Sequence, residues 1–227
     1  MIDSKITIMA IDTSCDDTSV AVLRNGRVLS NVVSSQTDVH QEWGGVVPTL
    51  AKRAHEQYLD KCIEMALKRA FVYEVERLDA IAVTHGPGLA PALQVGIAKA
   101  KDLSVRCGKP LIAVNHMEGH LLSPLLKNRQ GKYYSPIGTV HCPWLSMIVS
   151  GGHTEIVWVE KIGTYKIVGK TLDDAAGEAF DKVARMLGLG YPGGAVIESM
   201  ALQGNPDRYK LPRSEEHTSE LQSRQSI

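Results

Sequence analysis

The sequence predicts an α/β protein made of two similar halves that meet near residues 128–135. Residues 5–34 and residues 144–172 each carry the pattern of three short strands joined by tight turns. Between these segments, residues 78–125 alternate short apolar strands with helices, which is the order that parallel strands with right-handed crossovers require. A strand pattern that occurs twice, each time followed by helices, predicts duplicated halves with a cleft between them.

The first half is expected to open with two hairpins in series. Residues 5–11, 19–23 and 27–34 are rich in β-branched residues, which favour strands. Asn25-Gly26 supplies two adjacent positions that tolerate positive φ, and this dipeptide is the strongest short signal for a hairpin.

A long helix is expected after the loop QEWGGVVP, with Thr49 as its cap. The segments LDAIAVT and KPLIAVN, residues 78–84 and 109–115, are expected to be buried strands. Pro91 opens the helix between them at a position where a missing N–H costs nothing. The face of the long helix that is expected to be buried consists of Leu50, Ala54, Tyr58, Cys62, Met65 and Ala66.

In the second half, the strands lead into a helix with an acidic first turn, DDAAGEAFDKVARMLGL, then the glycine loop GYPGG and a short helix. The last segment, residues 213–227, is polar and lacks aromatic residues, as is typical of a disordered terminus. It also resembles the in-frame translation of a common sequencing-adapter oligonucleotide. We therefore expect that the natural gene was cut at about Pro212 and that the residues after it are not part of the natural protein.

Charge and cysteine usage exclude several classes of protein. Lys plus Arg and Asp plus Glu both total 25, so no net field indicates nucleic-acid or membrane binding, and a tRNA partner would need a local patch. The four cysteines form no C-x-x-C pair, which fits reduced thiols better than a disulfide framework. No apolar stretch approaches the roughly 18–20 residues of a spanning helix. We expect a cytoplasmic protein without membrane contact.

The segment NHMEGH, residues 115–120, is the first candidate site. Residues four apart on a helix lie about 5–6 Å apart at Cβ, so His116 and His120 can converge on one metal ion. A pair alone is more often structural, and two ligands are fewer than the usual three or four. The pair does follow a strand directly, where open α/β sheets place their sites. Glu118 stands one position too late to be the base of an H-E-x-x-H peptidase.

Two glycine turns are the next candidates. In IVSGGHT, Gly151 and Gly152 let the backbone approach a ligand, and their N–H groups can form an anion-binding nest. The same pattern suits an ordinary hairpin turn. In YPGGAVIE, a glycine turn meets a helix N-terminus, which can receive a phosphate or a ribose hydroxyl.

Acidic residues form two further groups. DDAAGEAFDK places Asp174, Glu178 and Asp181 on nearby turns, where such residues are usually a solvated helix face. In IDTSCDDT, acidic turn residues are also commonplace. Asp12 at the end of a strand beside a cleft would be less ordinary. Asp16, at the hairpin tip, is our candidate for deprotonating or orienting an acceptor amine.

Taken together, these motifs resemble one family. DTSCDDT, GGVVP, GPGL, NHMEGH, VSGGHTE, DDAAGEAFDKVARMLGL and YPGG occur in the order seen in the tRNA N6-adenosine threonylcarbamoyltransferase family, formerly labelled O-sialoglycoprotein endopeptidase. The resemblance runs from about Ile6 to Asn205. It implies two ASKHA-type halves, the actin-like, sugar-kinase-like and ribonuclease H-like architecture.

The resemblance also implies that the second half is incomplete. The family's later Asn-containing substrate loop and a third metal ligand, an Asp near the C-terminus, are missing from this chain. We therefore expect residues 1–130 to form the first half and residues 131–212 to begin the second, and we expect the fragment itself to be inactive.

The implied activity is transfer of a threonylcarbamoyl group from threonylcarbamoyl-AMP to N6 of the adenosine 3′ of the anticodon, in tRNAs that read codons beginning with A. His116 and His120 would bind one divalent metal ion per subunit, iron or zinc. Ala195 and Glu198 stand where many bacterial members carry Pro and Asp. The residues implied to bind the substrate are Ile148, Val149, Ser150, Gly151, Gly152, Asp181, Gly194 and Glu198.

The implied partners are tRNA, threonylcarbamoyl-AMP and accessory proteins, namely an inactive paralogue and a small ATPase. Two other functions stay open from the sequence. An ATP-dependent phosphotransferase of the same architecture would use the glycine turns for ATP and would not need the histidine pair. A non-catalytic scaffold paralogue would be expected to lose HMEGH, which this chain keeps.

Overall fold

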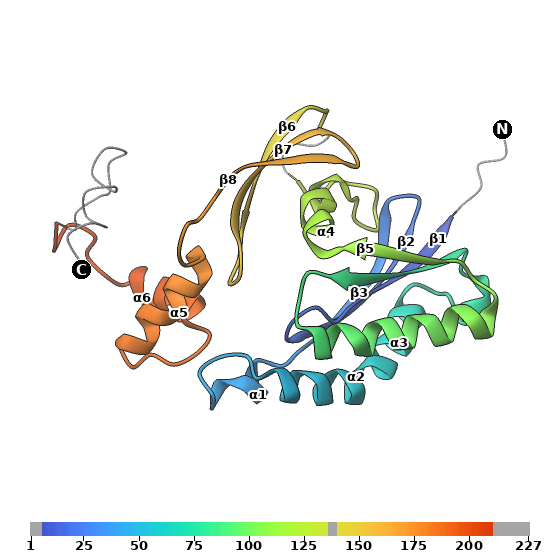
Figure 1. Cartoon of the computed structure of the whole chain (residues 1–227), viewed down its shortest axis with the longest axis horizontal. Coiled ribbons are helices and arrows are strands. Elements are labelled where there is room, and N and C mark those ends of the chain that lie inside the picture. The colour runs from blue at the N-terminus through green and yellow to red at the C-terminus, as the bar shows by residue number, and fades with distance from the viewer. Residues whose placement is uncertain (1–5, 136–139, 211–227) are drawn as a thin grey trace.

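The computed structural model describes residues 6–135 and 140–210, which form a five-stranded mixed sheet followed by a three-stranded antiparallel sheet and two helices (Figure 1). The strand order of the first sheet is β3-β2-β1-β4-β5, and that of the second is β6-β7-β8. The predicted α/β class is confirmed, as is the repeated unit of three antiparallel strands. The adapter-like segment 213–227 lies outside the described residues.

The hairpins of the first half form as predicted. β1 pairs with β2, and β2 pairs with β3, both antiparallel. Asn25 and Gly26 have φ of 49° and 72°, the two positive values that the tight turn requires. Along β1, buried and half-buried residues alternate, because one face of the sheet packs on the helices. The three strands are β1 Thr7–Asp12, β2 Asp17–Arg24 and β3 Arg27–Ser35.

The long helix α2, Pro48–Arg69, starts two residues earlier than expected, so the prediction that Thr49 caps it is wrong. Pro48 occupies the first turn, where its missing N–H is no loss, and Val47 precedes it without a side-chain cap. Ala54, Cys62 and Ala66 of the expected face are buried, and the other three members are half-buried at its border. A short helix, α1 Thr37–Gln41, precedes α2 and was not expected.

Two parallel strands complete the first sheet. β4, Ala80–Gly86, pairs with β1, and β5, Leu111–Asn115, pairs with β4. Helix α3, Ala90–Cys107, connects them, with Pro91 in its first turn as predicted and Gly108 at its C-cap with φ of 60°. The expectation that β5 is buried is wrong. Leu111 and Ile112 are 37% and 42% exposed, because β5 is the edge strand.

Helices α2 and α3 pack side by side on one face of the first sheet, below it in Figure 1, and α4 lies on the other face. The core between sheet and helices is made of residues from both layers, among them Met9, Ile11 and Val20 of the strands and Leu59 and Ile63 of α2. A turn of 3-10 helix, Val75–Arg77, precedes β4.

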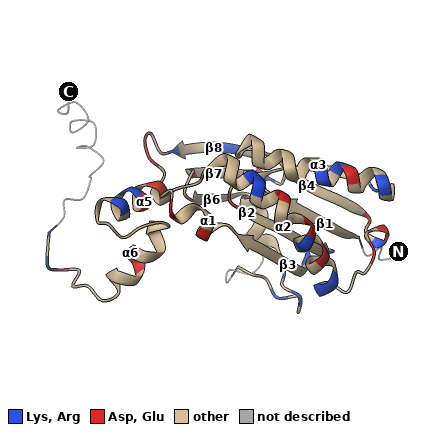
Figure 2. Ribbon diagram, turned by 90° about the horizontal axis from the view of Figure 1, so that it is seen from below, with Lys and Arg blue, Asp and Glu red and all other residues tan. Residues whose placement is uncertain are grey.

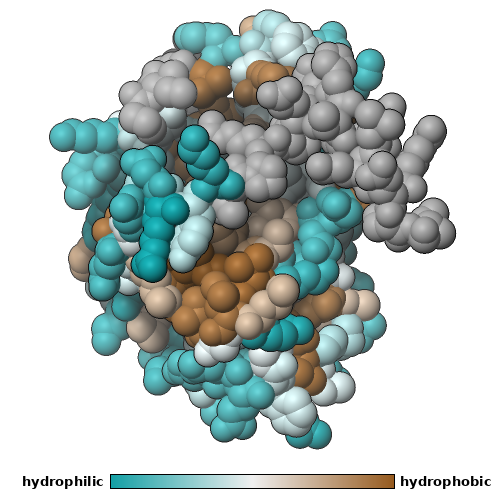
Figure 3. All heavy atoms as spheres, turned by 90° about the vertical axis from the view of Figure 1, so that its left-hand side faces the viewer, coloured by the Kyte–Doolittle hydropathy of each residue, from teal (hydrophilic) through white to brown (hydrophobic). Residues whose placement is uncertain are grey.

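The second unit is smaller and more exposed. Its core contains Ile148, Val157 and Val159, and Leu121 of α4 joins them, so α4 links the two units. Figure 3 shows apolar side chains gathered on the face that carries α5 and α6 in Figure 1, where Met186 and Leu202 are each 85% exposed. The elements are α4 His116–Leu122, a 3-10 turn Ser123–Leu125, β6 Trp144–Val149, β7 Thr154–Lys161, β8 Thr164–Lys170, α5 Ala176–Met186 and α6 Gly193–Ala201.

Cys15, Cys62, Cys107 and Cys142 are all free thiols. Within residues 6–135 and 140–210, none of the helices combines the length and the apolar character that crossing a bilayer demands.

Candidate functional site

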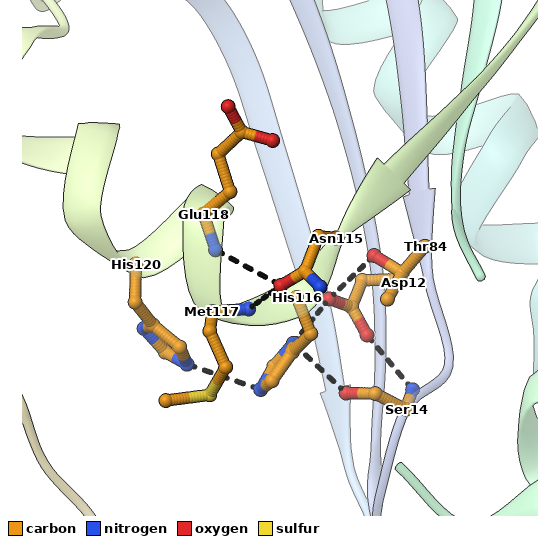
Figure 4. A network of polar contacts seen from close by, with 8 residues as sticks. All are labelled: Asp12, Ser14, Thr84, Asn115, His116, Met117, Glu118 and His120. Atoms are coloured by element: carbon orange, nitrogen blue, oxygen red, sulfur yellow. Dashed lines mark hydrogen bonds and ion pairs between the residues drawn. The ribbon is translucent and has the colours of Figure 1, made fainter. Parts of the chain in front are cut away.

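The histidine pair lies where three strands end. Asn115, the last residue of β5, is also the N-cap of α4, and its side chain accepts hydrogen bonds from the N–H groups of Met117 and Glu118 at 2.9 and 3.2 Å (Figure 4). This cap starts the helix at His116. One turn later, His120 Nε2 faces His116 Nε2 at 3.1 Å. The predicted convergence of the two imidazoles is therefore present in the fold.

Asp12, at the end of β1, holds the other side of His116. Its Oδ2 lies 3.0 Å from His116 Nδ1 and accepts a hydrogen bond from Thr84 Oγ1 at 2.9 Å, while its Oδ1 accepts from Ser14 N at 2.8 Å (Figure 4). Burial alone would raise the pKa of Asp12, but the hydrogen bonds from His116 and Ser14 outweigh it and lower the pKa below its ordinary value. An ionised Asp12 keeps the proton of His116 on Nδ1, which leaves the Nε2 lone pair facing His120.

The electrostatic surroundings of His120 also favour a free lone pair on its imidazole. Desolvation, followed by the nearby charge of His116, lowers its pKa, so its imidazole is neutral at neutral pH. Glu118 points away from both rings (Figure 4) and accepts a hydrogen bond from the Tyr165 hydroxyl at 2.6 Å. This position excludes it as a general base beside the pair, as the motif spacing predicted.

The SGGHT turn is tied to the start of α5. Gly177 N donates to Ser150 O at 3.1 Å, and Ala176 N donates to Thr154 Oγ1 at 2.9 Å. A Cβ on Gly177 would lie 2.7 Å from Ser150 O and 2.8 Å from the Gly151 backbone, so only glycine permits this approach. Thus the motifs SGGHT and AGEAFDK, which are about 25 residues apart in the sequence, form one structural unit.

Within the SGGHT turn, the Ser150 hydroxyl already occupies two of the backbone N–H groups. Ser150 Oγ accepts from His153 N at 3.0 Å and from Gly152 N at 3.3 Å. A bound anion would therefore have to replace that hydroxyl or be held by the N–H of Gly151.

The structure gathers most of the predicted site residues around one cavity of about 790 Å³. The histidine pair lines it together with Ser150, Gly151 and Gly152 of the turn. Asp16 and Asp181 lie on its wall as well. Asp181 Oδ1 also accepts from Gly193 N at 2.7 Å, which ties α5 to the start of α6.

Four of the residues implied to bind substrate do not line this cavity. Ile148 is 7% exposed and packs in the core of the second unit, so only its backbone could face a ligand. Val149 is exposed at the end of β6. Gly194 is half-buried in the first turn of α6, and Glu198 is exposed one turn further along.

Several cavity residues were not identified from the sequence. Lys182 pairs with Asp174 and with Glu178, at 2.6 and 3.1 Å. Arg185 of α5 donates to the carbonyl oxygen of Gly44, so it joins the second unit to the loop before α2. The contact of Arg185 with Gly44 spans 141 residues, so no local pattern in the sequence predicts it.

Two titratable groups beside Asp16 remain protonated at neutral pH. Desolvation and the neighbouring charge of Asp16 raise the pKa of the Cys15 thiol to about 12. Desolvation and the charges of Asp16 and Asp181 raise the pKa of Tyr191 to about 12. Cys15 is therefore a poor nucleophile, and Tyr191 is a hydrogen-bond donor.

A chain of buried polar groups supports the cavity wall from behind. His55 of α2 is 0% exposed, and its Nε2 donates to the carbonyl oxygen of Cys15 at 3.0 Å. Because that carbonyl can only accept, Nδ1 must be the acceptor, and it receives Thr18 Oγ1 at 2.7 Å and Gln36 Nε2 at 3.3 Å.

The same reasoning extends to a second buried histidine. Gln36 Oε1 accepts from His40 Nε2 at 3.2 Å, and His40 Nδ1 accepts from Val47 N at 3.4 Å. In both rings Nε2 is thus the donor and Nδ1 the acceptor. This buried polar chain joins the acidic turn at Cys15 to the loop that ends at Val47, and both segments border the cavity.

The fold and the cavity together define an α/β protein of two related units, with a histidine pair and a glycine turn facing each other between them. The chain belongs to the family described as TsaD: tRNA N6-adenosine threonylcarbamoyltransferase, whose profile matches residues 27–224. The matched range runs past Pro212, so the expectation for residues 213–227 stays a prediction.

Curated relatives carry the same description. The protein named tRNA N6-adenosine threonylcarbamoyltransferase from Syntrophotalea carbinolica is 51% identical over 207 residues, which cover 91% of this chain and 57% of the relative. The protein of that name from Thermodesulfovibrio yellowstonii is 50% identical over 212 residues, 93% of this chain and 61% of the relative. The chain thus spans about 60% of the length of these relatives.

Solved structures show a more distant likeness. YeaZ from Pseudomonas aeruginosa has a TM-score of 0.44 and 21% identity, over 73% of this chain and 67% of that chain. The ROK hexokinase from Thermus thermophilus has a TM-score of 0.46 and 17% identity, over 88% of this chain and 71% of that chain.

Proposed function

We propose that this chain carries the metal-binding and much of the adenylate-binding part of a tRNA N6-adenosine threonylcarbamoyltransferase. The observation that carries the proposal is the meeting of NHMEGH, SGGHT and AGEAFDK at one cavity, in a chain about 50% identical to relatives of that name. In the reaction, N6 of the adenosine attacks the carbamoyl carbon of threonylcarbamoyl-AMP. The bond from that carbon to the phosphate oxygen breaks, AMP leaves, and N6 loses a proton.

His116 and His120 would hold one divalent metal ion, iron or zinc. The donor set fits this role in part, because His116 Nε2 and His120 Nε2 face each other at 3.1 Å and Asp12 orients one ring from behind. Among the residues that the structure describes, no cluster of three or more His, Cys, Asp or Glu side chains could complete the site. When bound, the metal would act as a Lewis acid that stabilises negative charge on phosphate or carbamoyl oxygens.

The remaining roles fall to the cavity wall. The backbone from Ile148 to Gly152 would approach the adenylate, and Asp181, Gly194 and Glu198 would lie toward its ribose. Asp16 would orient the acceptor amine or accept its proton, because it projects from a hairpin tip into the cavity.

We also infer the setting in which this site works. The protein would be cytoplasmic and would act on tRNA with accessory proteins, namely an inactive paralogue and a small ATPase. The family's name does not favour the phosphotransferase alternative, which would need ATP turnover.

The test adds to this chain the part of the relatives that it does not span. Residues 6–210 replace the aligned stretch of the Syntrophotalea carbinolica relative, and the hybrid is assayed with that organism's accessory proteins, tRNA, threonine, bicarbonate and ATP. We expect threonylcarbamoyladenosine by mass spectrometry. A folded hybrid that binds AMP but forms none of it would refute the proposal. ATP consumption with a small hydroxylated acceptor would favour the phosphotransferase.

A further inference from the structure

We propose that a basic surface at the end of the first sheet far from the histidine pair binds the sugar-phosphate backbone of the tRNA. This inference rests on the proposed function, since it names where the RNA substrate is held outside the cavity. The surface, called the basic patch below, consists of the cationic residues Arg27, Arg69, Lys127, Arg129 and Lys132 and the rings of Phe71 and Tyr133.

Two of the segments that form the basic patch are joined by backbone hydrogen bonds. Val28 N donates to Lys127 O at 2.8 Å, and Lys127 N donates to Gly26 O at 3.0 Å. The Arg27 guanidinium lies against Gly131, where an added Cβ would be only 3.2 Å from its central carbon. The tip of the β2–β3 hairpin and the loop of residues 127–132 thus form one surface.

The end of α2 supplies the third segment. Arg129 Nη1 donates to the carbonyl oxygen of Arg69 at 3.4 Å, and its guanidinium lies 4.8 Å from the centre of the Phe71 ring. Lys127 Nζ lies 4.6 Å from the centre of the Tyr133 ring. Both cations are therefore held over aromatic faces rather than left free to move.

Among the residues that the structure describes, no carboxylate forms an ion pair with a cation of the basic patch. Within residues 6–135 and 140–210, none of its five cations has an Asp or Glu oxygen within 4.0 Å, whereas the nearby Arg77 pairs with Glu74 at 3.4 Å. Figure 2 shows blue segments close to the labels of β1 and β3, at the end away from α5 and α6. A chain without net charge needs such a local field to attract a polyanion.

The backbone at Phe71 gives independent support. Phe71 has a φ of 57° directly after the C-cap of α2, where glycine is favoured, and its side chain is 63% exposed. A bulky residue in this conformation is strained, and its exposed ring gains little from burial. Neither packing nor backbone geometry therefore explains the phenylalanine, which favours a functional role for the ring. A surface of cations beside aromatic rings, of which the Phe71 ring is exposed and the Tyr133 ring half-buried, can hold an RNA backbone and stack an unpaired base.

The experiment measures binding of a fluorescein-labelled, unmodified tRNA transcript that reads a codon beginning with A, by anisotropy at several salt concentrations. The variant R129E plus K132E should weaken binding about tenfold or more and reduce the salt slope by about 1–2. The matched control, K161E plus K166E on exposed positions of β7 and β8, changes the net charge equally and should stay within about twofold of the parent. Equal loss in both variants, or none in the first, would overturn the proposal.

A second variant separates RNA binding from stability. F71G removes the ring and relieves the backbone, so its thermal midpoint should be equal to or above that of the parent while tRNA binding weakens. Unchanged tRNA affinity in F71G, or binding of polyglutamate in place of tRNA by the parent, would overturn the proposal. Binding of AMP and metal at the cavity is measured in all variants. If the basic patch does not bind tRNA, the variants should still bind AMP and metal at the cavity. If instead the hybrid has no transferase activity, tRNA binding at the basic patch should be unaffected.

Discussion

Replacing His55 by leucine should destabilise the protein strongly, although the substitution adds apolar volume. The Thr18 hydroxyl and the Gln36 amide, which are 0% and 1% exposed, would each lose the partner that His55 Nδ1 provides. An orphaned buried polar group costs about 1–3 kcal/mol, so the two together cost about 2–6 kcal/mol. Burial of the leucine returns roughly 1–2 kcal/mol. The net loss should be about 3 kcal/mol, or roughly 10 °C in Tm for a chain of this size.

A double-mutant cycle gives the decisive measurement. Urea unfolding is followed by circular dichroism for the parent, H55L, T18V and the double variant. T18V removes the hydroxyl that would lose its partner in H55L. The loss in the free energy of unfolding of the double variant should therefore be smaller than the sum of the two single losses by about 1 kcal/mol or more. H85L, at an exposed position of β4, should change stability by about 0.5 kcal/mol at most. Strict additivity would refute the hydrogen-bond assignment.

The same histidine predicts a pH dependence of known sign. Desolvation lowers the pKa of His55 below its ordinary value of 6.5, so the unfolded chain binds a proton more readily than the folded one. This contribution to stability is therefore present above about pH 6.5 and is lost as the pH falls below it. H55L should show a weaker decline than the parent over that range. An equal decline in both proteins would assign the effect to other groups.

Three further outcomes follow from the site. The double variant H116A plus H120A should lower bound metal, measured by elemental analysis, to background while keeping the circular dichroism of the parent; unchanged stoichiometry would contradict the assignment. D16A, placed in the active hybrid, should slow tRNA modification without changing AMP affinity, and a parental rate would remove Asp16 from the mechanism. G177A should break the contact between α5 and the SGGHT turn and abolish AMP binding by calorimetry, since its Cβ meets backbone at 2.7 Å, whereas G119A, with open space around it, should not.

Local chemistry in the sequence predicted the elements that depend on few neighbours. Asn25-Gly26 forms its hairpin because the two residues themselves tolerate positive φ. His116 and His120 converge because helical spacing alone brings them onto one face. Pro91 opens α3 for the same kind of local reason.

What depends on tertiary structure was missed. The exposure of β5 reflects its place at the sheet edge, which an apolar run such as LIAVN does not reveal. His40 and His55 lie on two consecutive helices, and only the packing of these helices brings Gln36 within hydrogen-bond distance of both rings. Asp12 was noted as unusual at a strand end, yet its pairing with His116, 104 residues away, could not be derived from spacing.

Asn115 belongs both to a strand and to a helix cap, and so it links the histidine pair to the sheet. It is the last residue of β5 to pair with β4, opposite Gly86, and it is also the cap from which the seven-residue helix α4 begins. No linker separates the pair from the edge strand, so a displacement of the two rings is transmitted directly to the β4–β5 ladder. Occupancy of the histidine pair should therefore be readable at a distance, as slower hydrogen–deuterium exchange of the β5 amides than in the metal-free chain.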